Sequence, residues 1–245
     1  YDLTVPAVAG TNSIDLSKLP VLAANNKLGI GTTSPTSDLH IQRTGSNASI
    51  TIEETSATNY SQYVELKDST TSWYMANRYA ITGANNSGFG IGTTSSGDML
   101  QIDTSGRVTT PSQVGFSVYT TASTAMSNTI QFGGTDFNTG NHFNTSNGIF
   151  TAPVAGKYYF HFHLLQSRTT STGEGYVDFY KNGSYHYRNY EFKDGTINQH
   201  VEYKGGMFAS LAANDTIFLY LQASVGSLSI ISNFHHCKFG GYLLG

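Results

Sequence analysis

Histidines are the residues of this chain that most invite a metal-binding or catalytic interpretation. His161 and His163 share one face of a predicted strand, and His235 and His236 precede Cys237, the only cysteine. Side chains of these types bind zinc or iron when three or four of them converge. No spacing in the sequence resembles such a site. We therefore expect polar strand faces or subunit contacts here rather than a metal centre.

Acidic side chains are the second group that could do chemistry, because two carboxylates flanking a glycosidic bond can hydrolyse it. No spacing singles out a pair. The sequence also has no nucleophile elbow, phosphate loop or dinucleotide fingerprint. We therefore expect no enzymatic activity. The acidic residues available for this role in the last third of the chain are Glu174, Asp178, Glu191, Asp194 and Glu202.

An aromatic segment suits binding better than catalysis. It follows a predicted hairpin turn, and its tyrosines alternate with hydrogen-bonding groups that could orient a sugar or an aromatic partner. The polar loop at residues 167–175 is a second exposed candidate. The alternative, which we prefer for the tyrosines, is a strand that packs within the protein or at a subunit interface. The candidate receptor contacts are Tyr185, Tyr187, Arg188, Tyr190 and Arg168.

The composition predicts an all-β protein. Charged residues make up only 12% of the 245 residues, and the chain is rich in aromatic residues and glycine. Such residues suit pleated strands and tight turns. The net charge of −3 offers no basic surface to nucleic acid, and no run of about 18 apolar residues is present to insert into a membrane. The sequence starts at Tyr1 without a visible leader, so we expect a longer parent protein.

An internal repeat marks the first half of the chain. Residues 29–34 (GIGTTS) recur as residues 90–95, and each copy precedes a short alternating strand. Repeats of this kind indicate stacked structural units. Between the two copies, alternating apolar residues predict strands at residues 48–53, 63–67 and 72–76.

Three regions follow from these patterns. Residues 1–28 predict an extended N-terminal lead-in, residues 29–111 a β-rich shaft or small β-domain bounded by the repeats, and residues 112–245 a head domain. Residues 104–111, which contain a glycine and a proline, are expected to be a linker between shaft and head. A small β-domain needs aromatic residues such as Trp73 for its own core, and we prefer that role to a sugar-binding patch.

The first repeat copy resembles a motif of bacteriophage tail-fibre shafts and related bacterial surface fibres. The similarity lies in the string GIGTTSP followed by the short strand LHI. The second copy has serine in place of the proline, so its turn is expected to differ. The resemblance implies a trimeric shaft, in which glycines permit close approach of three backbones.

The head sequence predicts a β-sandwich. Strand-length segments recur at sandwich spacing, and the pair Asn182-Gly183 supplies a hairpin turn. Alternation at residues 158–163 predicts a strand with one aromatic core face. Residues 216–221 predict a core strand, and residues 239–244 predict a terminal strand docked into a sheet.

The head resembles the C1q and tumour-necrosis-factor family of jelly-roll domains. The resemblance implies a ten-stranded jelly roll that forms a compact trimer and binds ligands. The collagen stalk that is usual in C1q proteins is absent, and the β-shaft takes its place. Some family members bind calcium, but no acidic ligand set can be assigned here, so calcium stays open and no other cofactor is expected. The eight residues that carry the resemblance are Phe132, Asn138, Phe143, Phe150, Gly156, Tyr158, Phe160 and Phe162.

Together these features predict a homotrimeric bacteriophage fibre protein with a C1q/TNF-like jelly-roll head. We expect it on the virion, as a tail fibre that contacts a host surface glycan or protein through the head and other virion proteins through its N-terminal region. Three low-affinity sites would supply adsorption through avidity. The main alternative is a capsid head fibre or decoration protein with a structural role, and the third is a bacterial surface adhesin.

Overall fold

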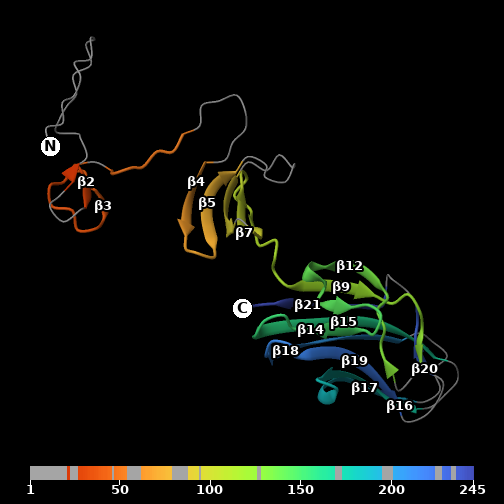
Figure 1. Cartoon of the computed structure of the whole chain (residues 1–245). Helices are drawn as coiled ribbons and strands as arrows, with labels where there is room; N and C mark the ends of the chain where they lie inside the picture. Colours follow the sequence, from red (N-terminus) through yellow and green to blue (C-terminus); the bar gives the residue numbers. More distant parts are fainter. Residues whose placement is uncertain are drawn as a thin grey trace. The chain divides into compact units, whose positions relative to one another are not determined.

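The computed structural model of the chain is built from β-strands (Figure 1), as the composition predicted. The one helical element in the described part of the chain is a 3-10 turn at Thr139–Asn141. No helix there is long and apolar enough to cross a membrane. Two compact units make up the chain, residues 1–63 and residues 64–245. The structure describes residues 21–22, 27–45, 47–53, 62–78, 88–93, 95–125, 128–168, 173–194, 201–223, 228–232 and 236–245.

A small three-stranded sheet lies in the N-terminal unit, in the order β1-β2-β3. Its strands are β1 (Val21–Leu22), β2 (Leu28–Ile30) and β3 (Leu39–Ile41). β2 contains the start of the first repeat copy, and β3 pairs with it in parallel. Gly31 begins the connection with a φ of 76°, a conformation that residues with a side chain rarely adopt. Residues 1–20, most of the predicted lead-in, lie outside the described residues.

The strand predicted at residues 48–53 is wrong. Residues 47–53 pair with no strand among the described residues, and Ile50 and Ile52 are 70% and 51% exposed. Their alternation suits a strand, but a strand forms only where a neighbour accepts its backbone hydrogen bonds.

A five-stranded sheet follows in the order β4-β5-β6-β7-β8. β4 and β5 confirm the strands predicted at residues 63–67 and 72–76. The second repeat copy runs through the central strand β6 and turns into the antiparallel strand β7, so the two copies fold differently. The strands are β4 (Gln62–Lys67), β5 (Ser72–Arg78), β6 (Gly88–Thr93), β7 (Gly97–Asp103) and β8 (Val108–Thr109).

The linker predicted at residues 104–111 is wrong in part, because β8 lies inside it and pairs with β7. Gly106, with a φ of 81°, turns the chain between these two strands. Glycine therefore marks a hairpin within the sheet here rather than a boundary between domains.

Two sheets form the head. The first has the order β10-β20-β15-β21-β9-β12, with β18 along β15, and the second has the order β13-β14-β19-β16-β17, with β11 beside β19. The strands of the first sheet are β9 (Gly115–Tyr119), β10 (Thr124–Ala125), β12 (Gly134–Asn138), β15 (Gly156–Arg168), β18 (Val201–Leu211), β20 (Leu228–Ile230) and β21 (Lys238–Leu243). The strands of the second sheet are β11 (Asn128–Thr129), β13 (Phe143–Asn144), β14 (Ile149–Thr151), β16 (Gly173–Lys181), β17 (Ser184–Asp194) and β19 (Thr216–Ala223).

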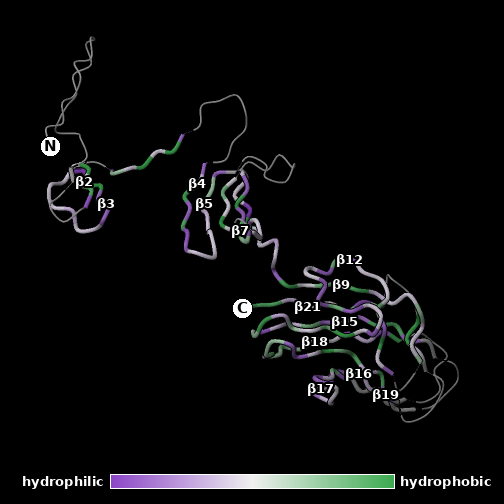
Figure 2. The backbone as a smooth tube through the Cα atoms, in the orientation of Figure 1, coloured by the Kyte–Doolittle hydropathy of each residue, from purple (hydrophilic) through white to green (hydrophobic). Residues whose placement is uncertain are grey.

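Aromatic side chains fill the core of the head. Tyr158, Phe160 and Phe162 of β15 are almost fully buried, as their alternation predicted. The ring centroid of Phe116 on β9 lies 4.8 Å from that of Phe143 in the opposite sheet. Figure 2 shows hydrophobic segments, in green, interspersed with polar ones along the head strands. Packing of aromatic rings across the sandwich therefore joins its two sheets.

Three further predictions in the head are confirmed. Residues 216–221 lie within β19, and the predicted terminal strand is β21, which pairs with β15 and β9. Asn182 and Gly183 form the turn between β16 and β17, with φ values of 52° and 77°. Two successive positive φ values are what a two-residue hairpin with the right twist requires.

Candidate functional site

The outer face of the second head sheet is rich in aromatic side chains. Val177 and Phe179 of β16 are fully buried in the core, whereas Tyr176 and Tyr180 lie on the outer face and are half-buried. β19 pairs with β16, so that Phe218 lies opposite Tyr180 on this face, where only 9% of Phe218 is exposed. We call this set the tyrosine surface. It comprises Tyr176, Tyr180, Tyr185, Arg188, Phe218, Tyr220 and Gln222.

Tyr180 lies at the centre of the tyrosine surface. Its ring centroid is 5.3 Å from that of Phe218, 5.0 Å from that of Tyr220 and 6.4 Å from that of Tyr185. Gln222 Nε2 donates a hydrogen bond of 3.0 Å to the Tyr180 hydroxyl. Rings held in this way lose little freedom when a ligand covers them, which favours binding.

Arg188 is fixed by a carboxylate beneath the surface. Its Nε and Nη2 donate hydrogen bonds of 3.0 and 3.2 Å to the two oxygens of Asp178, which is fully buried. These bonds raise the pKa of Arg188 above its usual value. The guanidinium carbon lies 3.6 Å from the ring centroid of Tyr176. Arg188 is thus a permanent cation that stacks on one tyrosine and neutralises a buried charge.

The structure brings together only part of the predicted receptor contacts. Tyr185 pairs with Tyr180 and Arg188 pairs with Asp178, so both lie on the outer face. Irregularities in the pairing between β16 and β17 place Tyr187 opposite the inward-facing Phe179 instead. The side chains of the other two candidates, Tyr190 and Arg168, lie outside the described residues.

Several residues of the tyrosine surface were missed in the sequence. Phe218 and Tyr220 belong to the strand that was predicted to lie in the core, and Tyr180 belongs to the predicted hairpin. A signal was present, because Phe218 and Tyr220 alternate with aliphatic residues at Ile217, Leu219 and Leu221. In a strand, the intervening positions must face away from the core.

The outer face of the first head sheet carries a second aromatic cluster. Pairing of β18, β15 and β21 aligns Phe208, Tyr159 and Tyr242, which we call the aromatic row. Tyr159 lies 4.9 Å from Phe208 and 5.7 Å from Tyr242 between ring centroids. Phe208 is 75% exposed, the highest value among the large apolar side chains described.

His161 lies next to the aromatic row, with its ring centroid 6.0 Å from that of Tyr159. Burial lowers the pKa of His161, so this histidine is neutral at pH 7. The face around the aromatic row therefore combines exposed rings with an uncharged imidazole, as expected for a surface that another protein chain covers.

Comparison with known proteins identifies this two-sheet head. Residues 115–244, more than half of the chain, match the C1q domain. The chain belongs to the C1q domain family. It is 29% identical over 109 residues to the collagen alpha-1(X) chain of Mus musculus, which covers 44% of this chain. The chain spans only 15% of the length of that relative.

Solved structures also match about half of the chain. The globular domain of zebrafish complement 1qA protein is 20% identical and superposes with a TM-score of 0.41 over 54% of this chain and 98% of that one. Murine APRIL, crystallised at pH 8.5, is 13% identical with a TM-score of 0.42, over 54% and 99% of the two chains.

The eight residues that carried the resemblance to the C1q family maintain the fold of the head. All six aromatic members are buried in the core. Asn138 binds the backbone of Phe143 twice, through Nδ2 to the carbonyl at 2.8 Å and through Oδ1 from the amide at 3.1 Å. A side chain at Gly156 would meet Leu243 of the terminal strand. These residues therefore specify the fold of the C1q domain rather than a ligand site.

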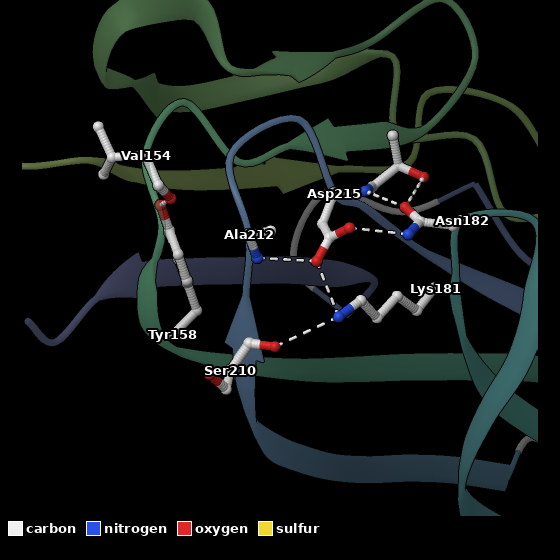
Figure 3. A network of polar contacts seen from close by, with 8 residues as sticks. Val154, Tyr158, Lys181, Asn182, Ser210, Ala212 and Asp215 are labelled. Atoms are coloured by element: carbon white, nitrogen blue, oxygen red, sulfur yellow. Dashed lines mark hydrogen bonds and ion pairs between the residues drawn. The ribbon is translucent and has the colours of Figure 1, made fainter.

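A polar network joins several loops at one end of the C1q domain (Figure 3). Asp215 accepts hydrogen bonds from Asn182 Nδ2 at 2.7 Å and the Ala212 amide at 2.8 Å, and Lys181 Nζ lies 2.8 Å from its Oδ2. Led by the Asn182 bond, these contacts lower the pKa of Asp215 to about 2. The network fixes the hairpin turn of β16 and β17 to the start of β19.

The histidines considered for metal binding separate in the C1q domain. His163 and His236 lie 6.4 Å apart between ring centroids, and His163 Nε2 is 3.6 Å from Glu202 Oε2. A hydrogen bond from Lys204 lowers the pKa of Glu202. Across the described residues, no group of three or more histidine, cysteine or acidic side chains is placed to hold a metal ion. His235 lies outside those residues.

Proposed function

We propose that this protein is a non-enzymatic, homotrimeric fibre of a bacteriophage virion, which attaches to the host cell surface through the tyrosine surface of its C1q domain. The observation that carries the proposal is the tyrosine surface itself, where an exposed ring and a fixed guanidinium lie side by side on a C1q domain. C1q domains are known for trimeric assembly and for binding. The GIGTTSP string supports a fibre shaft, because it resembles those of phage fibres.

The aromatic row supports trimer formation. An exposed Phe208 flanked by Tyr159 and Tyr242 costs free energy when it faces water, and burial against another copy of the chain recovers that energy. The neutral His161 beside the row adds no charge repulsion between copies. Trimerisation would then leave the tyrosine surface free, because it lies on the other sheet of the sandwich.

The tyrosine surface supports recognition of a glycan or a protein epitope. Tyr185 is 55% exposed and presents a ring on which a sugar or an aromatic side chain can stack. Arg188 lies 5.7 Å from that ring and is held in place by Asp178, so its outward N–H groups are positioned for hydrogen bonds before a ligand arrives. Three such surfaces on a trimer bind a cell through avidity.

Cell binding by a Tyr185→Ala variant tests this proposal. Fluorescently labelled protein would be applied to a panel of bacterial strains, with Tyr63→Ala as the matched control, since Tyr63 is equally exposed but lies outside the C1q domain. We expect Tyr185→Ala to lower binding by about tenfold or more, because each of three sites is weakened, and Tyr63→Ala to have no effect. Unchanged binding by a trimeric Tyr185→Ala protein would remove the tyrosine surface as the receptor site.

Immunogold labelling of intact phage with antibody against residues 112–245 tests the position on the particle. Gold on tail fibres or at the tail tip is the expected result. Gold spread over the capsid would instead favour a head fibre or decoration protein. Label on uninfected bacteria with none on phage would favour a bacterial adhesin and overturn the virion proposal.

A further inference from the structure

Four strands of the five-stranded sheet, β5 to β8, share an apolar face. Strand register aligns its side chains in two cross-strand rows, with one further aromatic residue two positions before the first row on β5. We call these seven residues the apolar face. The rows are Met75–Ile91–Leu100 and Phe89–Ile102–Val108, and the flanking residue is Trp73.

The opposite face of this sheet is buried in the single chain, and the polar groups on it bind one another. Tyr74 pairs with Gly92 of the central strand, and both Tyr74 and Asp98 are 8% exposed. The Tyr74 hydroxyl donates to Asp98 Oδ1 at 3.0 Å, and Gln101 Nε2 donates to Asp98 Oδ2 at 2.9 Å. Tyr74 and Ala76, at 8% and 3% exposed, show that the sheet already buries this face within one chain. The apolar face is the one that stays open to solvent.

Within the described residues, the apolar face has no second layer over it. Trp73, Met75, Phe89 and Val108 are 42%, 40%, 42% and 60% exposed. Apolar side chains left in water cost free energy, and a contiguous exposed apolar surface marks an interaction site. Something must therefore cover this face in the working protein.

A copy of the same chain is the occupant that fits best. On strands β5–β8 the apolar face includes no charged residue, so identical faces can meet around a symmetry axis without bringing like charges together. Only residues 110–114 separate β8 from the first strand of the C1q domain. Five residues span at most about 17 Å, so a trimer of C1q domains holds three such sheets at a millimolar effective concentration.

We propose that the apolar face is a second inter-chain interface, in which the sheets of three protomers pack on one another and share a core that one chain cannot form. This inference rests on the trimer in the proposed function, but it does not depend on a virion or a receptor. It assigns Trp73, Met75 and Phe89 to the centre of an interface.

Fluorescence of the native protein tests the inference directly, because Trp73 is the only tryptophan in the chain. Quenching by acrylamide would be measured on full-length protein whose oligomeric state is set by sedimentation. The reference is a Phe208→Glu variant, diluted until it sediments as a monomer. Packed interface cores exclude water, so we expect about threefold weaker quenching in the wild-type trimer.

A second variant tests whether the apolar face itself protects Trp73 from acrylamide. Phe89→Ser changes a neighbouring member of the apolar face without touching Trp73, and Tyr187→Ser is the control at a similarly exposed aromatic residue of the head. We expect Phe89→Ser to raise quenching of the trimer towards the monomer value, and Tyr187→Ser to leave it unchanged.

The outcomes separate this inference from the trimer on which it rests. A wild-type trimer in which acrylamide quenches Trp73 as readily as in the monomer would overturn the inference and leave the trimer intact. A wild-type protein that stays monomeric would overturn the trimer. A monomer with protected Trp73 would show that the chain covers its own apolar face, which also overturns the inference.

Discussion

Arg188, which was predicted to contact a ligand, binds a buried carboxylate of its own domain. Its guanidinium neutralises the buried Asp178 and stacks on Tyr176, so only part of its hydrogen-bonding capacity faces solvent. A variant of Arg188 would therefore change both the fold and any ligand contact. Tyr185 separates the two effects, since its side chain is mostly exposed.

Arg188→Ala is expected to destabilise the head by about 2–3 kcal/mol, because it leaves the Asp178 carboxylate buried without its cation. Urea unfolding followed by circular dichroism measures this loss. The double variant Asp178→Ala/Arg188→Ala should lose less than the sum of the two single losses, since it removes the stranded charge as well. Additive losses would contradict coupling between the two residues.

Asp215 predicts a pH dependence of stability. Its pKa is lowered from 3.8 to about 2 in the folded protein. Its contribution to stability is therefore fully present above about pH 4 and is lost as the pH falls through about 2. We expect Asp215→Asn to lower the urea midpoint at pH 7 and the difference from wild type to shrink between about pH 4 and pH 2. A difference that stays constant across this range would contradict the role of the carboxylate.

At the scale of single elements, two glycines of the head are required for different reasons. Gly183 has a positive φ in the β16–β17 turn, but a side chain there would meet no atom within 4 Å. Gly241 lies in β21, where an added Cβ would lie 2.5 Å from Phe160 and 2.9 Å from Phe116. The first position is constrained by backbone conformation and the second by packing in the core.

Gly241→Ala is therefore expected to cost more stability than Gly183→Ala. Overpacking against two core rings costs about 2–3 kcal/mol, whereas a left-handed alanine in an open turn costs about 1 kcal/mol. Thermal unfolding of the two variants under one condition measures the order. The reverse order would indicate that β21 shifts to accommodate the methyl group.

The elements of the head could be predicted from sequence because each carries a local signal. Alternation identified β15, the Asn182-Gly183 pair identified the hairpin, and the signature residues identified the family. The two repeat copies show that a local signal does not determine how a strand pairs. They are identical over six residues, yet the first leads to a parallel strand and the second to an antiparallel one. The partner of a strand depends on residues far away in the sequence, and a six-residue string does not include them.

The tyrosine surface and the aromatic row were only partly predictable for a related reason. Tyr185 and Arg188 were identified as neighbours in sequence, but Tyr180 joins them only through the pairing of β16 with β17, and Phe218 only through the pairing of β16 with β19. The pairing irregularities that separate Tyr187 from Tyr185 also depend on the partner strand. The aromatic row needs three strands aligned, so no single segment reveals it.

At the scale of the whole molecule, the proposed assembly would use apolar surfaces on two separate sheets of the chain. The aromatic row would join the C1q domains, and the apolar face would join the sheets that precede them. Each interface holds the chains close together for the other, so the two would strengthen one another.

Concentration-dependent unfolding is expected from this assembly. Unfolding of a trimer releases three chains, so the unfolding temperature should rise by about 5 °C for a hundredfold increase in protein concentration. Phe208→Glu should weaken this dependence, while Val154→Glu, at an exposed apolar position away from the aromatic row, should preserve it. Calorimetry over a dilution series measures the effect, and a temperature independent of concentration would contradict a trimer that unfolds with its chains.

The single thiol of this chain can report how often and how fast the head opens. Cys237 is fully buried, and burial raises its pKa, so the folded head offers no reactive thiolate to an alkylating reagent. Labelling can then proceed only through transient opening of the region where Cys237 meets β15. At low reagent concentration the labelling rate measures how often the open form is populated, and at high concentration it measures how fast the head opens. The opening rate sets how long the folded head persists, and this one residue makes that rate accessible without any engineered probe.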